Sequence, residues 1–162
     1  MKTFKEIEEY AAKNFVPIAR KDFVEFFKDL IIKNNFHDIL EIGSAIGYTT
    51  VNLALLENVY VTTIEYNDAR YELCMVNIKD FNVEDKVLAI HDDALNVFIS
   101  QKFDVIFIDN IVFNDFKKYV SPKKAKFYEG KINELKEYLA SLTNYDVCYS
   151  EIGDGIAILK KK

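Results

Sequence analysis

The sequence predicts an α/β domain with a mostly parallel sheet and helices on both faces of that sheet. Short apolar runs alternate with helical patterns, which is the arrangement that produces βαβ units with right-handed crossovers. Glycines or acidic residues follow most of these runs. The predicted strands span residues 38–42, 59–64, 87–90 and 103–109, and a closing antiparallel hairpin spans 145–151 and 156–160 around Gly153-Asp154-Gly155.

Two helices are expected before the first strand. Residues 3–6, Thr-Phe-Lys-Glu, form a capping-box pattern that begins a helix through about Asn14, and Pro17 breaks the pattern. A second helix carries apolar residues at helical spacing and ends at Asn34-Asn35. Its apolar stripe consists of Phe23, Phe26, Phe27, Leu30 and Ile31.

The remaining helices are expected to connect the strands. They are predicted over residues 49–57, from Asn67 to about Phe81, over 94–100 and from Ser121 to Leu142. The strand at 103–109 is almost wholly apolar, and we therefore expect it to be buried on both faces.

Length and composition indicate a globular protein. The 162 residues suit a single domain, with N-terminal helices in residues 1–35 and an α/β core in residues 36–162. No apolar run approaches the ~20 residues that span a bilayer, so the cytoplasm is the expected location. The net charge of −5 excludes a globally basic nucleic-acid binder. Lysines nevertheless gather between Lys117 and Lys126. They would form either a solvated helix face or a local patch that contacts phosphates.

The segment from Asp38 to Tyr48 is the most informative part of the chain. It is an apolar strand followed by a loop with Gly43 and Gly47, and glycine lets a ligand approach the backbone closely. Glu65 ends the next strand about 20 residues farther on, where an acidic residue can bind the ribose hydroxyls of a nucleotide. This pairing predicts a ligand that carries a ribose.

Four polar groups follow strand ends and should therefore meet at one edge of the sheet. Singly, Glu65 could cap a helix, Asp93 could sit in a turn and Asp109 could simply end its strand. Their convergence is the stronger signal. The four groups are residues 41–48, Glu65, Asp92-Asp93 and Asp109-Asn110.

In this order, the motifs resemble those of the class I S-adenosylmethionine-dependent methyltransferases. The catechol-type O-methyltransferases, which include bacterial tRNA 5-hydroxyuridine methyltransferases, are the most similar group. The resemblance covers nearly the whole chain and is most specific at residues 39–49. The matching segments are residues 8–18, 39–49, 63–65, 92–95, 103–109 and 152–155.

The resemblance implies a Rossmann-like fold and a role for each site residue. S-adenosylmethionine would be the cofactor, with Glu65 on its ribose, Asp93 near its adenine and Asp109 near its sulfonium. Asp109 and Asn110 would act in catalysis and could hold Mg²⁺. The residues implied around the methionine moiety and ribose are Glu41, Gly43, Ser44, Gly47 and Tyr48.

The chain departs from this family directly after the fourth strand. Asn110 follows Asp109 at once, where the family continues through a helix and a strand, so a unit of roughly 25 residues is missing and the sheet should be one strand short. One aspartate and one asparagine then remain where the family uses three metal ligands, and a hard cation such as Mg²⁺ needs several oxygens. The family's lysine base is missing as well.

The leading expectation is methyl transfer to a hydroxyl oxygen of a modified tRNA uridine, contacted through residues 117–126. A small catechol-like phenol is the alternative acceptor. A cofactor-binding protein that has lost its transferase activity also stays open. A nicotinamide dinucleotide is disfavoured because the chain lacks a G-x-G-x-x-G loop. The N-terminal helices could form a homodimer, although their phenylalanines would equally suit the core.

Overall fold

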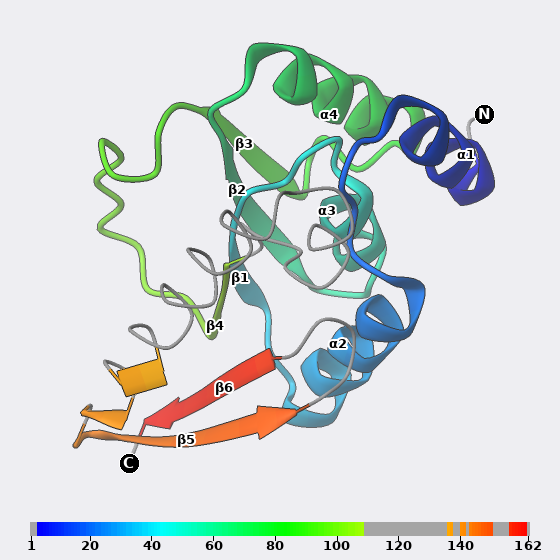
Figure 1. Cartoon of the computed structure of the whole chain (residues 1–162). Helices are drawn as coiled ribbons and strands as arrows, with labels where there is room; N and C mark the ends of the chain where they lie inside the picture. The colour runs from blue at the N-terminus through cyan, green and yellow to red at the C-terminus, as the bar shows by residue number, and fades with distance from the viewer. Residues whose placement is uncertain (1–2, 109–135, 138–139, 142, 151–155, 162) are drawn as a thin grey trace, which may run out of the picture. The chain divides into compact units, whose positions relative to one another are not determined.

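The computed structural model describes residues 3–108, 136–137, 140–141, 143–150 and 156–161 (Figure 1). The chain divides into two compact units, residues 1–110 and 111–162. Within the described residues, no helix has both the length and the apolar character needed to cross a membrane.

The first unit contains a four-stranded, fully parallel sheet with the strand order β3-β2-β1-β4. Its central pairing aligns Asp38 with Tyr60 and Ile42 with Ile64, so the two middle strands end together. The α/β fold expected from the sequence is confirmed. The strands are β1 (Asp38–Ile42), β2 (Tyr60–Glu65), β3 (Val87–His91) and β4 (Val105–Ile108).

Four helices accompany this sheet: α1 (Phe4–Asn14), α2 (Lys21–Asn34), α3 (Tyr48–Ala54) and α4 (Asp68–Asp80). Helices α3 and α4 are the crossovers from β1 to β2 and from β2 to β3, and they pack beside each other in Figure 1. Thr3 and Glu6 form the predicted capping box of α1, and the Asn67 side chain caps α4 by accepting the Arg70 N–H. The N-terminal boundaries of these two helices were thus predictable from their caps.

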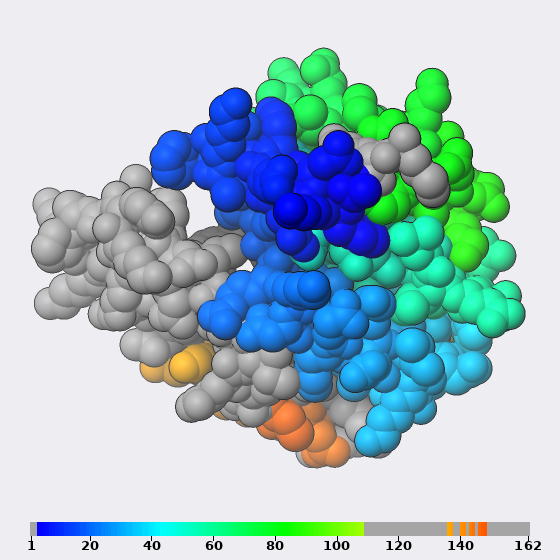
Figure 2. Space-filling view, turned by 90° about the vertical axis from the view of Figure 1, so that its right-hand side faces the viewer, coloured from blue at the N-terminus to red at the C-terminus, as the bar shows by residue number. Residues whose placement is uncertain are grey.

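Helix α2 packs its phenylalanine stripe against the edge strand β4. The Phe107 ring lies 5.0 Å from the Phe23 ring and 5.1 Å from the Phe27 ring, measured between centroids. The central strands contribute fully buried Ile39 and Val61 to the same core. Figure 2 shows α1 and α2, in dark and lighter blue, exposed on one face, together with turquoise and green segments of the first unit.

Two sequence-based expectations are corrected in this unit. No helix forms over residues 94–100, where a short turn spans residues 94–96, because the Asp93 carboxylate accepts the Leu95 N–H and offers the backbone a competing turn. The fourth strand is not buried on both faces, since Ile106 is 60% exposed and Ile108 is 64% exposed. An apolar run shows that a strand can be buried but does not show what covers it.

The second unit contains an antiparallel hairpin of β5 (Tyr145–Ser150) and β6 (Ile156–Lys161), which confirms the predicted closing hairpin. Its register aligns Tyr145 with Lys161 and Ser150 with Ile156. Residues 136–137 and 140 are helical, as predicted for 121–142. The rest of that predicted helix and the turn at 153–155 lie outside the described residues.

Candidate cofactor site

The glycine loop, residues 43–47, leads from β1 into α3 at the carboxyl edge of the parallel sheet. The Gly43 N–H donates to the Ile64 carbonyl at 2.8 Å, which joins the loop to the end of β2. Gly47 has a φ of +80°, and a Cβ placed on it would lie 2.7 Å from Cys74 Sγ. The position therefore requires glycine twice over, for its backbone conformation and for the close approach of α4.

Glu65 lies directly beside this loop at the end of β2 and is only 4% exposed. Its Oε2 atom accepts the Ala45 N–H at 2.8 Å, and its Oε1 atom accepts the Asn67 N–H at 2.9 Å. A carboxylate offers about four acceptor positions, so these two bonds leave acceptor capacity for ligand hydroxyls. The structure thus brings together the glycine loop and the acid that the sequence paired with it.

Glu41 lies beneath the loop and is 1% exposed. Its Oε2 atom accepts hydrogen bonds from the Thr50 hydroxyl and, at 2.8 Å, from the Thr63 hydroxyl. These bonds join β1, α3 and β2, which fixes the floor of the site. Ser44 is also buried, at the start of the same turn.

Tyr48 is the first residue of α3, and its side chain is directed toward α1. The hydroxyl donates to Glu8 Oε1 at 2.5 Å, and the residue is 4% exposed. Burial raises the pKa of Tyr48 above its usual value, and the hydrogen bond to the Glu8 carboxylate raises it further. Tyr48 therefore stays protonated and donates at neutral pH.

Asp93 follows β3, which is parallel to β2 and aligns His91 with Glu65. Asp93 is exposed and its Oδ1 atom accepts the Leu95 N–H at 2.9 Å, so it sits in the turn that the sequence allowed as an alternative. Beside it, the His91 ring stacks on Tyr71 with centroids 4.5 Å apart. The remaining predicted site residues, Asp109 and Asn110, lie outside the described residues, as does the lysine segment 117–126.

Within residues 3–108 and the other described ranges, no group of three or more His, Cys, Asp or Glu side chains is arranged to hold a metal ion. The predicted Mg²⁺ site depends on Asp109 and Asn110, so it stays a prediction.

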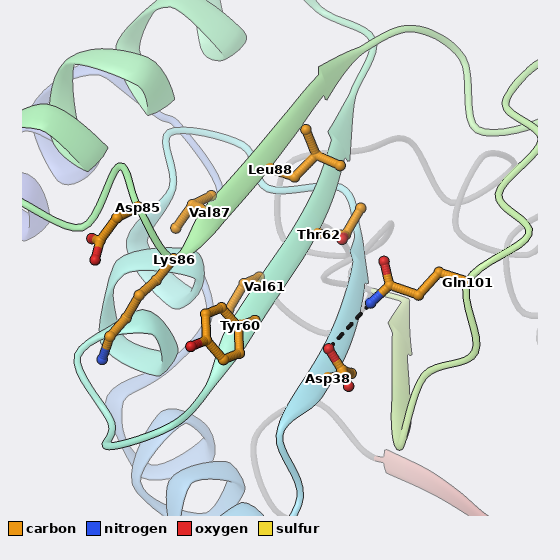
Figure 3. Close-up of a pocket in the computed structure, with 9 residues that line it drawn as sticks. All are labelled: Asp38, Tyr60, Val61, Thr62, Asp85, Lys86, Val87, Leu88 and Gln101. Carbon is orange, nitrogen blue, oxygen red and sulfur yellow. Dashed lines mark hydrogen bonds between the residues drawn. The ribbon is translucent and has the colours of Figure 1, made fainter.

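A surface hollow of about 320 Å³ lies elsewhere, at the amino ends of β1, β2 and β3 (Figure 3). Asp38 and Tyr60, the first residues of their strands, line it together with Lys86. The Gln101 amide donates to Asp38 Oδ1 across its rim at 3.1 Å. Because ligands of open parallel sheets bind at the carboxyl ends of the strands, this hollow is not assigned to the cofactor.

Some residues that shape the site were not identified from the sequence. The Asn77 amide donates to the Ile46 carbonyl at 2.6 Å, which holds the glycine loop against α4. Asn77 is 1% exposed and follows Cys74 by one helical turn. The buried residues of α4 are Cys74, Asn77 and Ile78, and an asparagine at helical spacing from Cys74 was a usable signal. Glu8 had none, because its partner lies 40 residues away along the chain.

Comparisons with known proteins give a family match and structures of similar fold. A family model described as O-methyltransferase matches residues 1–137. Caffeoyl-CoA O-methyltransferase 1 of Eucalyptus globulus is 24% identical over 200 residues, covering 97% of this chain and 80% of its own length. Those 200 aligned positions outnumber the 162 residues of the chain, so part of the plant protein has no counterpart here.

Solved structures of similar fold include a Staphylococcus aureus protein provisionally named a caffeoyl-CoA O-methyltransferase. It has a TM-score of 0.86 and 26% identity, covering all of this chain and 93% of its own. An O-methyltransferase from Bacillus cereus was solved in complex with SAH (S-adenosylhomocysteine). It has a TM-score of 0.75 and 22% identity, covering 99% of this chain and 92% of its own.

Proposed function

Because the chain belongs to the O-methyltransferase family, we propose that it transfers the methyl group of S-adenosylmethionine to a hydroxyl oxygen of an acceptor. The observation that carries this proposal is the buried Glu65 carboxylate, which lies against the glycine loop at the carboxyl edge of the sheet. The complex of the Bacillus cereus protein with SAH supports the choice of cofactor.

In this reaction, the acceptor oxygen forms a bond to the methyl carbon as the bond from carbon to sulfur breaks. The electron pair goes to sulfur, and the hydroxyl proton leaves to a base. Such a displacement mainly requires alignment of donor and acceptor. The chain supplies a rigid loop for close backbone contact and Glu65 as a charged acceptor for the ribose hydroxyls.

Asp109 and Asn110 are the residues proposed to bind Mg²⁺ and to lie beside the reacting groups. A cation bound there would lower the pKa of the acceptor hydroxyl and orient it. With two protein ligands, water would have to complete the octahedral shell, which predicts weak binding. Methyl transfer that survives EDTA unchanged would contradict this part of the proposal.

The acceptor is proposed to be a small catechol-like phenol, because the plant and Staphylococcus aureus proteins carry caffeoyl-CoA in their names. The modified tRNA uridine, which was the leading expectation from the sequence, becomes the alternative. It is supported by the lysines between Lys117 and Lys126, whose positive charge suits a phosphate backbone.

Two measurements test the function. Calorimetry should detect SAH binding, and labelled S-adenosylmethionine should transfer its methyl group to caffeoyl-CoA or to unmethylated tRNA. SAH binding without transfer to either acceptor would favour a cofactor-binding protein that has lost its activity. The absence of any SAH binding would overturn the proposal altogether.

A further inference from the structure

The N-terminal helix α1 is attached to the cofactor site by one polar contact and a group of aromatic contacts. Ile7 and Ala11 bury the inner side of the helix. The Phe4 ring meets the Tyr48 ring edge-on, with centroids 5.9 Å apart, and packs on Phe81 at 4.6 Å. Phe4 therefore contacts both the start of α3 and the residue that follows α4.

The polar contact is the hydrogen bond from the Tyr48 hydroxyl to Glu8 Oε1, which is 2.5 Å long and partly buried. Hydrogen bonds to ionised groups are about twice as strong as neutral ones, and reduced access to water strengthens them. Because the pair spans 40 residues, it is a tertiary link and not part of the local structure of either helix.

Tyr48 also lies where the glycine loop ends and α3 begins. It follows Gly47, whose N–H donates to the Ser44 carbonyl at 2.8 Å and whose carbonyl accepts the Val51 N–H at 3.0 Å. The backbone at Tyr48 is therefore held on one side by the loop and on the other by α3. A side-chain tie to α1 at this residue restricts the conformations that the unliganded loop can adopt.

We infer that Glu8 is a positioning residue, which holds the glycine loop in its cofactor-binding conformation through Tyr48. This inference rests on the proposed function. Docking of α1 and binding of the cofactor then favour each other, since each orders the loop that the other needs. By reciprocity, cofactor binding should protect α1 from local opening.

The test compares SAH affinity among variants by calorimetry, at a temperature where every variant is folded. We expect Glu8→Ala and Tyr48→Phe each to weaken SAH binding about fivefold or more. The double variant should be no weaker than either single variant, because both remove the same contact. Glu8→Gln keeps an acceptor oxygen for the Tyr48 hydroxyl but loses the charge, so it should recover part of the affinity that Glu8→Ala loses.

The matched control is Glu9→Ala, which removes the neighbouring charge on the same helix. Glu9 pairs with Lys5 at the surface, and its side chain is 65% exposed. Hydrogen exchange supplies a second readout. SAH should slow exchange of the amides of residues 4–14 in the wild type and in Glu9→Ala, but not in Glu8→Ala.

Two results would count against the inference in different ways. If the wild type binds SAH and Glu8→Ala binds it equally well, the positioning role is wrong while the proposed function stands. If the wild type binds no SAH, both are overturned.

Discussion

The Glu65 carboxylate accepts the Ala45 N–H at 2.8 Å, although 20 residues separate the two along the chain. This bond joins the end of β2 to the middle of the glycine loop. Ala45 has a φ of +48°, a conformation that few residues other than glycine adopt readily. The buried charge therefore holds the loop in a shape that its own sequence would not favour.

Replacing Glu65 should weaken cofactor binding more than it weakens folding. Glu65→Gln keeps one carbonyl acceptor but turns an N–H group toward its donor partners, and it removes the negative charge. Hydrogen bonds to charged groups contribute about 1.5–3 kcal/mol, so SAH affinity should fall by about tenfold or more. Glu57→Gln, an exposed site before β2, is the control. Equal affinity of both variants in calorimetry would refute the ribose-binding role.

Gly47→Ala should destabilise the fold, because it adds a Cβ at a φ of +80° and within 2.7 Å of Cys74 Sγ. The conformational part alone is about 1–2 kcal/mol, and urea denaturation would measure the total free energy of unfolding. Adding Cys74→Ala should recover only the part due to the clash. Ala45→Gly is the control, since that position tolerates glycine. A fully stable Gly47→Ala would show that neither the backbone conformation nor the approach of Cys74 requires glycine at this position.

Asp104 should make stability depend on pH at the acidic end. Its Oδ2 atom accepts the N–H groups of His37 at 2.8 Å and Asp38 at 3.0 Å, and these bonds hold the pKa of the carboxyl below its usual value. Because the folded pKa is depressed, the stabilisation is present above the unfolded pKa of about 3.9 and disappears as the pH falls through the folded value.

In the variant Asp104→Asn, the free energy of unfolding should therefore depend less on pH below about pH 4. At neutral pH it should lower the free energy of unfolding by under about 1 kcal/mol, because the side chain is exposed. Asp85→Asn, which makes the same charge change at another exposed site, is the comparison. Profiles of the two variants that coincide in acid denaturation would count against the Asp104 bonds.

Phe107→Ala should loosen the packing of β4 on α2. The residue is half-buried and contacts the rings of Phe23 and Phe27, so we expect a loss of about 2–3 kcal/mol in the free energy of unfolding. Ile108→Ala, next along the strand and 64% exposed, should lose much less. Similar losses from both substitutions would show that the two faces of β4 are packed alike.

The sequence was most informative where local physics decides the structure. The capping residues Thr3 and Asn67, the two glycines and the apolar strands each follow from short-range rules, so the first four helices and the parallel strands could be predicted. The end of α3 was predicted less well. The helix ends at Ala54 and not at Glu57, because the Leu56 N–H donates to the Leu53 carbonyl and tightens the turn.

Contacts between distant residues could not be predicted in this way. Neither the Glu8–Tyr48 bond nor the support of Glu41 by two threonines leaves a periodic pattern in the chain. The exposure of Ile106 and Ile108 was missed for the same reason, because burial depends on what covers a strand. The choice of Glu65 rested on its spacing from the glycine loop, which is a pattern that a sequence does record.

The Cys74 thiol lies on α4 and faces Gly47 of the glycine loop, and it gives the chain an internal chemical reporter. Burial raises its pKa to about 12, and the residue has no exposed surface. A thiol in that state resists alkylation until α4 separates from the loop. Cys148, which is exposed on the hairpin, would react at once. The slow phase of iodoacetamide labelling would thus time the opening of the core without an engineered cysteine.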